Sequence, residues 1–162
     1  MTIIWKGHGD LLADRAVKLV PCNAAGAMGA GLAKDVRDRW PEVYETYKSF
    51  FAPGISSVTD ICARARQIIP VTANDGNRFL LVCSKQHWRQ DADEALIRDN
   101  LATIADHWRQ WNIPELATPL LGAGLGHLNR THIEAILDDI FSPRHCALPV
   151  KIYLGLSFSH EA

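Results

Sequence analysis

The sequence predicts an α/β domain in which helices cover a largely parallel sheet. Short apolar runs alternate with segments whose apolar residues recur every three to four positions, as strands and helices do. Two glycine-rich loops, within residues 22–36 and 119–136, each follow an apolar run and lead into a helical segment. The 162 residues suffice for one domain with its own core. We therefore expect a single α/β domain over residues 1–162.

Six apolar or β-branched runs are the candidate strands. They are residues 2–5, 16–22, 67–71, 79–83, 115–120 and 150–158. Residues 7–12, after the first run, are expected to be a loop. The turn-rich segment Asn74–Asn77 joins the third and fourth runs, which favours a hairpin.

Helical spacing begins directly after each glycine loop. Leu32, Val36 and Trp40 recur at helical intervals, and Pro41 ends that helix and can occupy the first turn of the next. The second helix has an apolar stripe made of Val43, Tyr44, Tyr47, Phe50 and Phe51.

Capping patterns mark the two later helices. Asp91 with Glu94 three residues on predicts a capping box for one of them. For the helix after the second glycine loop, Thr131 with Glu134 is one candidate cap and Asn129 is the other. A regular apolar stripe follows, and Pro143 stops that helix.

Charge and cysteine content exclude several classes of protein. The formal net charge is −1, which argues against a broad basic surface for non-specific duplex binding, although a nucleic acid held locally stays possible. No CxxC pair or zinc spacing occurs, so buried free thiols in a reducing compartment are expected. Without a signal peptide or an 18-residue apolar run, we expect a cytoplasmic protein with no membrane contact.

The glycine loops suit a phosphate-containing ligand. A glycine turn that ends at a helix N-terminus presents free N–H groups and a partial positive charge. Neither loop is a Walker A motif or a GxGxxG fingerprint, so nucleotide hydrolysis and dinucleotide redox chemistry are disfavoured. Ligands of such sheets bind beyond the carboxyl ends of the strands. Both loops, and the segment from Ser84 to Arg89, should meet there.

Four segments together resemble a known family. They are Gly9-Asp10-Leu11, MGAGLA at 28–33 with WPEVYETY after it, Ser84-Lys85 followed by HWR, and PLLGAGLGHL from Pro119. In this order, over nearly the whole chain, they resemble a macro domain, an ADP-ribose-binding module. The likeness is greatest to the DNA ADP-ribosyl glycohydrolase class, which includes the DarG antitoxins and a human terminal ADP-ribose glycohydrolase. The resemblance implies a three-layer α/β/α sandwich with a mixed, largely parallel central sheet.

The resemblance also implies a set of ligand contacts. Asp10 would accept a hydrogen bond from the adenine amino group, and Leu11 would offer a backbone amide nearby. Asn23 would lie beside the distal ribose with the first loop, namely Met28, Gly29, Ala30, Gly31 and Leu32. In the second loop, Gly122, Ala123, Gly124 and Leu125 would wrap the diphosphate with backbone N–H groups. Pro119, Leu121 and Gly126 are further candidates for contact with the ligand. On the residues alone, Asp10 could instead be a turn residue and Asn23 could brace its loop.

Lys85 matches the lysine that carries catalysis in this class. A neutral lysine amine can attack the anomeric carbon of an ADP-ribosyl bond. Positive charge from Arg89 or His87 would favour the neutral amine and the phosphates would oppose it. The bland alternative is a solvated lysine at a strand end.

One position departs from the human relative, which has an aspartate where this chain has Gly126. A mechanism with a lysine nucleophile and a resolving aspartate is therefore in doubt. Lys85 could act with a substrate group, a water or His127. His87 and Trp88 are further candidates for contact with the substrate.

The expected function is removal of ADP-ribose from a modified nucleic acid, DNA above all, by a monomeric enzyme without a metal or other cofactor. Two alternatives are a non-catalytic ADP-ribose-binding module and an ADP-ribose 1″-phosphate phosphatase. An ADP-ribosylated macromolecule other than DNA stays open as the substrate.

Overall fold

The computed structural model describes residues 3–51, 64–87, 89–124 and 126–157. Its strands are β1 (Ile3–Gly9), β2 (Val17–Asn23), β3 (Ile69–Thr72), β4 (Arg78–Lys85), β5 (Leu116–Pro119) and β6 (Val150–Leu156). Its helices are the 3₁₀ turn η1 (Leu11–Ala13), α1 (Gly31–Arg39), α2 (Pro41–Phe50), α4 (Glu94–His107) and α5 (Arg130–Ile140).

The described strands form one mixed sheet in the order β1-β6-β5-β2-β4-β3. Neighbouring strands from β1 to β4 are parallel, and only β3 runs antiparallel, against β4. The β3–β4 hairpin turns through the expected segment Asn74–Asn77, where Ala73 N–H donates to Asn77 O. The parallel pairing confirms the prediction and puts the carboxyl ends of β1, β6, β5, β2 and β4 at one edge of the sheet.

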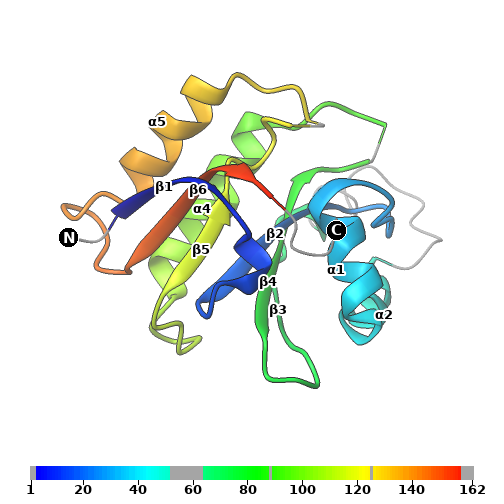
Figure 1. The fold of residues 1–162 in the computed structure, drawn as a ribbon. Coiled ribbons are helices and arrows are strands. Elements are labelled where there is room, and N and C mark those ends of the chain that lie inside the picture. Colours follow the sequence, from blue (N-terminus) through cyan, green and yellow to red (C-terminus); the bar gives the residue numbers. More distant parts are fainter. Residues whose placement is uncertain (1–2, 52–63, 88, 125, 158–162) are drawn as a thin grey trace.

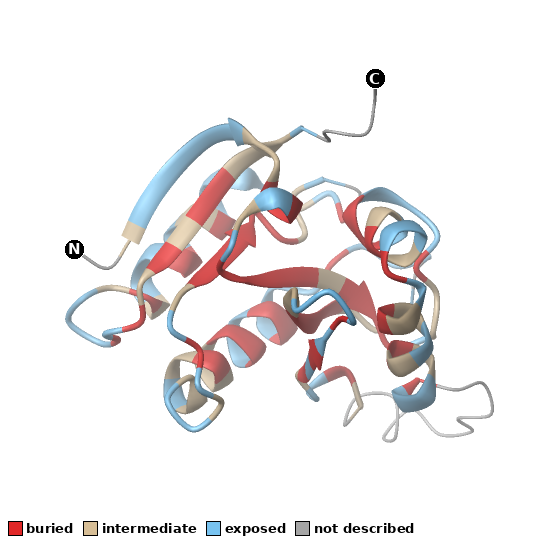
Figure 2. Cartoon of the chain, turned by 60° about the horizontal axis from the view of Figure 1, so that its bottom comes forward, coloured by how far each residue is buried: buried red, intermediate tan, exposed pale blue. Residues whose placement is uncertain are grey.

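Helices cover both faces of this sheet, as Figure 1 shows with α1 and α2 on one side and α4 and α5 on the other. Each face has its own apolar core. One contains Val36, Val43 and Tyr47 from α1 and α2, and the other contains Ile97 from α4 and Ile133 from α5. The predicted three-layer sandwich is confirmed. Burial is densest along β2, β4 and β5, whereas β1 at the sheet edge is largely exposed (Figure 2).

Three local predictions are corrected. Residues 7–9 continue β1 instead of forming a loop, because His8 and Gly9 stay in register with Gly155 and Leu156 of β6. Phe50 is 43% exposed and leaves the apolar stripe of α2, while Phe51 is buried. The cap of α4 is Asp93, whose side chain accepts from Ala95 N and Leu96 N, and not Asp91.

Other local predictions hold. Pro41 occupies the first turn of α2. Asn129 caps α5, since its side chain accepts from Thr131 N and His132 N. Cys22, Cys83 and Cys146 are buried free thiols; Cys62 lies outside the described residues. No helix in the described ranges combines the length and apolar character needed to cross a bilayer.

Candidate active site at the carboxyl edge of the sheet

The three predicted site segments start side by side. β2, β4 and β5 are neighbours, with β2 in the middle, and each is followed at its carboxyl end by one of these segments. Residues 24–30 follow β2, residues 86–93 follow β4, and residues 120–128 follow β5 (Figure 1). The prediction that two glycine loops and the segment after Ser84 share one edge is therefore correct for the backbone.

Lys85 is the last residue of β4 and is half-buried. It is in register with Asn23 at the end of β2, after a bulge that leaves Ser84 unmatched. Such bulges reorient side chains at strand ends. Gln86 O then accepts from Ala24 N at 2.9 Å, which ties the start of the first glycine loop to the residue after Lys85.

Asn23 braces the first glycine loop. Its Oδ1 accepts from Ala25 N at 2.9 Å, and its Nδ2 donates to Ala27 O at 2.8 Å. Tyr47 of α2 donates its hydroxyl to Asn23 O at 2.6 Å. The bracing alternative for Asn23 is thus correct. An amide nitrogen has two N–H groups, so a ribose contact through the second stays a prediction.

The first loop leads into a helix that no side chain caps. Met28 is buried, whereas Gly29, Ala30 and Gly31 are exposed. Ala30 is the N-cap of α1 and makes no side-chain cap hydrogen bond, so the first N–H groups of α1 have no side-chain acceptor there. A Cβ built on Gly29 would meet nothing within 4 Å. No neighbour within the described protein forces a glycine at this position.

The second loop contains one tight glycine and one open glycine. Gly122 has φ +84°, and its carbonyl accepts from Leu128 N at 2.8 Å to close the loop. A Cβ on Gly124 would meet nothing within 4 Å. Gly29 and Gly124 therefore both border open space at this edge, as expected where a backbone must let a ligand approach.

Gly126 is needed for packing. A Cβ here would lie 2.6 Å from both Ala92 Cβ and Gly122 O, which is closer than a Cβ carbon can approach a non-bonded atom. Gly126 O also accepts from Ala92 N at 3.0 Å, which joins this loop to the segment after Lys85. An aspartate at this position, as in the human relative, would displace the loop. In the described geometry, residue 126 therefore cannot supply the aspartate that would resolve a lysine adduct.

Asp10 lies at the carboxyl end of β1 and caps η1. Its Oδ1 accepts from Leu12 N at 3.1 Å, as the turn alternative predicts. Its Oδ2 is buried and has no partner among the described residues. Leu11 and Leu12 are buried beneath the turn. A buried carboxylate oxygen without a donor is costly, and an adenine amino group is a donor that would satisfy it.

The remaining candidates form the rim. His127 has φ +62°, and its Nδ1 lies 2.9 Å from Asp91 Oδ1. Both side chains are exposed. His87 Nδ1 accepts from Arg89 N within its own loop. Trp88 and Leu125 lie outside the described residues. The Asp91–His127 pair is a second link between the second glycine loop and the segment after Lys85.

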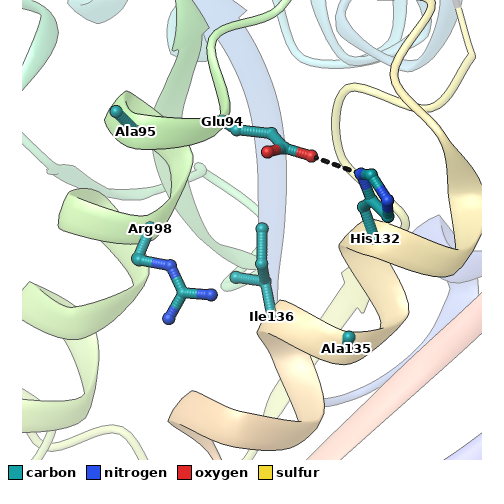
Figure 3. A pocket seen from close by; sticks show the side chains of 6 residues that line it. All are labelled: Glu94, Ala95, Arg98, His132, Ala135 and Ile136. Carbon is teal, nitrogen blue, oxygen red and sulfur yellow. Dashed lines mark hydrogen bonds and ion pairs between the residues drawn. The ribbon is translucent and has the colours of Figure 1, made fainter.

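A separate groove of about 460 Å³ lies between α4 and α5 (Figure 3). Its lining residues are Glu94, Ala95, Arg98, His132, Ala135 and Ile136. Glu94 and His132 face one another across it, with Oε1 3.2 Å from Nδ1. None of the predicted site residues lines this groove. Within the described residues, no group of three His, Cys, Asp or Glu is placed to hold a metal ion.

The residues that support the loops through hydrogen bonds from other elements could not be predicted from the sequence. Tyr47 appeared as one of several aromatic residues on a stripe, and nothing local shows that its hydroxyl reaches Asn23, 24 residues away. Tyr153 and Asp14, which hold the turn after Asp10, gave no signal either. Their sequence separation of 139 positions explains why.

No family model matches the chain. The DNA ADP-ribosyl glycohydrolase of Mycobacterium tuberculosis is 29% identical over 86% of this chain and 39% of its own length. Among solved structures, the macrodomain of Mycobacterium tuberculosis DarG superposes with a TM-score of 0.79, at 26% identity, over 93% of this chain and 96% of that one.

This chain has a macrodomain fold and resembles the DarG macrodomains. Thermosipho africanus DarTG in complex with ADP-ribose also matches, with a TM-score of 0.75 and 26% identity, over 91% of this chain and 40% of that one. The macrodomain described here spans about two fifths of the length of the curated relatives that it matches.

Proposed function

We propose that this macrodomain binds ADP-ribose and hydrolytically removes it from a modified nucleic acid, DNA above all. The observation that carries the proposal is the position of Lys85. It ends β4 at the sheet edge from which both glycine loops start, one residue before the hydrogen bond to the first loop. The names of the Mycobacterium tuberculosis relative and of the ADP-ribose complex of Thermosipho africanus DarTG support this assignment.

The ligand would lie along the carboxyl edge of the sheet. Asp10 Oδ2 accepts from the adenine amino group and the Leu11 amide contacts the same base. Gly122–Leu125 surround the diphosphate with backbone N–H groups, because oriented amides in a turn attract anions. Pro119, Leu121 and Gly126 shape this loop. Asn23 and the loop Met28–Leu32 lie beside the distal ribose, next to Lys85.

Lys85 acts at the anomeric carbon of that ribose. Attack by the neutral Nζ forms a nitrogen–carbon bond while the bond to the nucleobase breaks, and its electron pair leaves on the base, which takes up a proton. Water then attacks the same carbon, Nζ departs, and ADP-ribose is released. Since Gly126 supplies no acid or base, the water is activated by the substrate, by solvent or by His127 at the rim.

The proposal is tested with ADP-ribosylated single-stranded DNA and an ADP-ribosylated protein, incubated in parallel with the macrodomain. We expect label to leave the DNA only. Lys85→Ala should abolish release while calorimetry still detects ADP-ribose binding, because the diphosphate is held by backbone groups. Lys6→Ala, which removes an exposed lysine in the middle of β1, is the control and should retain activity.

Three outcomes would contradict the proposal. Tight ADP-ribose binding without turnover on either substrate would indicate a binding module. Phosphate release from ADP-ribose 1″-phosphate at a rate unaffected by Lys85→Ala would indicate a phosphatase. Undiminished release by Lys85→Ala would remove the lysine from the mechanism. The monomeric state and the cytoplasmic location suggested by the sequence stay predictions.

A further inference from the structure

The turn that carries Asp10 and Leu11 is held to β6 by a polar cluster around the buried side chain of Asp14. Tyr153 donates its hydroxyl to Asp14 Oδ2 at 2.7 Å. Lys151 Nζ lies 3.1 Å from Asp14 Oδ1 and 3.1 Å from Glu115 Oε1. The Asp14 side chain is 5% exposed. Its backbone N–H donates to Leu11 O, which closes η1. Asp14 is therefore fixed both to the turn and to β6.

Tyr153 also touches the other end of the same turn. A Cβ on Gly9 would lie 2.7 Å from Tyr153 Cε2. The backbone of Gly9 therefore packs directly against the Tyr153 ring, with no room for a side chain between them. Gly9 immediately precedes Asp10, and Asp14 follows η1. One side chain thus supports the turn at both of its ends, through its ring and through its hydroxyl.

The charge environment keeps that hydroxyl a donor. Burial and the neighbouring Asp14 carboxylate both raise the pKa of Tyr153. Burial alone would raise the pKa of Asp14, but hydrogen bonds from Ala16 N, Tyr153 and Lys151 lower it below its usual value. At neutral pH the bond therefore joins a protonated phenol to an ionised carboxylate, one of the stronger hydrogen bonds in proteins.

We propose that Tyr153 is a positioning residue for base recognition, which holds the Asp10–Leu11 turn so that Asp10 Oδ2 and the Leu11 amide select adenine. The inference rests on the proposed function. Asp10 Oδ1 is already used by Leu12 N, so selection depends on the direction of the remaining oxygen. A turn fixed in advance loses little entropy when the base binds, whereas a turn free to tilt would present Oδ2 in several directions.

The test compares ADP-ribose with inosine diphosphate ribose by calorimetry. Hypoxanthine has a carbonyl where adenine has the amino group and an N–H where adenine has a lone pair, so it mismatches both Asp10 and the Leu11 amide. We expect the wild type to prefer ADP-ribose by about tenfold or more. In Tyr153→Phe, which keeps the ring against Gly9, this preference should fall to about twofold, because a misaligned oxygen loses most of a hydrogen bond.

Tyr47→Phe is the matched control. It also removes a buried hydroxyl, but one that braces the first glycine loop, so any loss of affinity should be equal for both ligands and the preference should not change. Asp14→Ala removes the same bond from the acceptor side and should reduce the preference as Tyr153→Phe does. Binding is compared only for variants that keep a cooperative unfolding transition, and Asp14→Ala decides if Tyr153→Phe does not fold.

The outcomes separate this inference from the proposed function. A wild type that binds neither ligand would overturn the proposed function. A wild type that binds both ligands equally would show that Asp10 does not select the base, and the inference would fail. An unchanged preference in folded Tyr153→Phe or Asp14→Ala would overturn the inference and leave the proposed function standing.

Discussion

At the scale of single residues, the glycines of the second loop divide into two kinds. Gly126 lies against Ala92 and Gly122, and a Cβ would lie 2.6 Å from each. Gly124 borders open space and has no such neighbour. Glycine is therefore needed for different reasons at these two positions. At Gly126 the cause is packing within the protein, and at Gly124 we infer that it is the approach of a ligand.

Alanine substitutions should separate these causes. Gly126→Ala should lower the free energy of unfolding by about 1–3 kcal/mol, because the added methyl group overpacks the junction with Ala92. Gly124→Ala should leave stability within about 0.5 kcal/mol but weaken ADP-ribose binding at least about fivefold, because its methyl group occupies ligand space. Urea unfolding and calorimetry measure the two effects. Unchanged ADP-ribose affinity in Gly124→Ala would show that the diphosphate binds elsewhere.

At the scale of elements, α2 and β6 support loops that they do not belong to. α2 reaches the first glycine loop through the Tyr47 hydroxyl, and β6 reaches η1 through Tyr153. Both hydroxyls come from side chains that otherwise fill the apolar core. The rigidity of the candidate site thus depends on elements on which none of the predicted site residues lies.

Removing the hydrogen bond from Tyr47 of α2 to Asn23 O should measurably lower the stability of the fold. Tyr47→Phe should lower the free energy of unfolding by about 1–2 kcal/mol, since Asn23 O loses its buried donor. Tyr44→Phe, three positions earlier on the same helix and half-buried, should change stability by less than about 0.5 kcal/mol. Urea unfolding compares the two variants. Equal effects would mean that the hydroxyl of Tyr47 does not hold the loop.

The polar cluster that Asp14 forms with Tyr153 and Lys151 predicts a pH dependence of stability. The pKa of Asp14 is lower in the folded protein than its ordinary value of 3.8. A depressed carboxyl pKa stabilises the fold fully above the unfolded-state value, and this contribution is lost as pH falls through the folded-state value. The difference in unfolding free energy between wild type and Asp14→Asn should be constant from about pH 5 to 7 and shrink below about pH 4. A difference that stays constant to pH 3 would contradict the ionised Asp14 cluster.

At the scale of the whole molecule, sequence periodicity was sufficient to predict the layered fold and the sheet edge that bears the candidate site. Strands and helices alternate along the chain, and parallel strands must have their carboxyl ends at one edge of the sheet. Lys85 and both glycine loops could therefore be placed at that edge. Contacts between distant segments could not be predicted. Asp93, and not the predicted Asp91, caps α4, and its backbone N–H is bonded to Ser84 O at the end of β4. The extension of β1 to Gly9 depends on pairing with β6.

The site was predictable in its segments but not in their inner support. The order of the motifs predicted that Asp10, Asn23, Lys85 and the two loops contact the ligand, and these roles stay predictions. The use of the Asn23 amide within its own loop, the enclosure of Gly126 and the bond between Tyr153 and Asp14 all arise from packing between elements. Sequence spacing carries no information on such contacts, because each partner is far away along the chain.

We propose above all that main-chain amides of the second glycine loop hold the diphosphate while Lys85 reaches the distal ribose. A crystal structure of the macrodomain with ADP-ribose tests it most directly. We predict phosphate oxygens about 2.9 Å from backbone nitrogens of residues 122–125 and Lys85 Nζ about 3.5 Å from the anomeric carbon. ADP-ribose bound with its distal ribose away from Lys85, or in the groove between α4 and α5, would contradict the account.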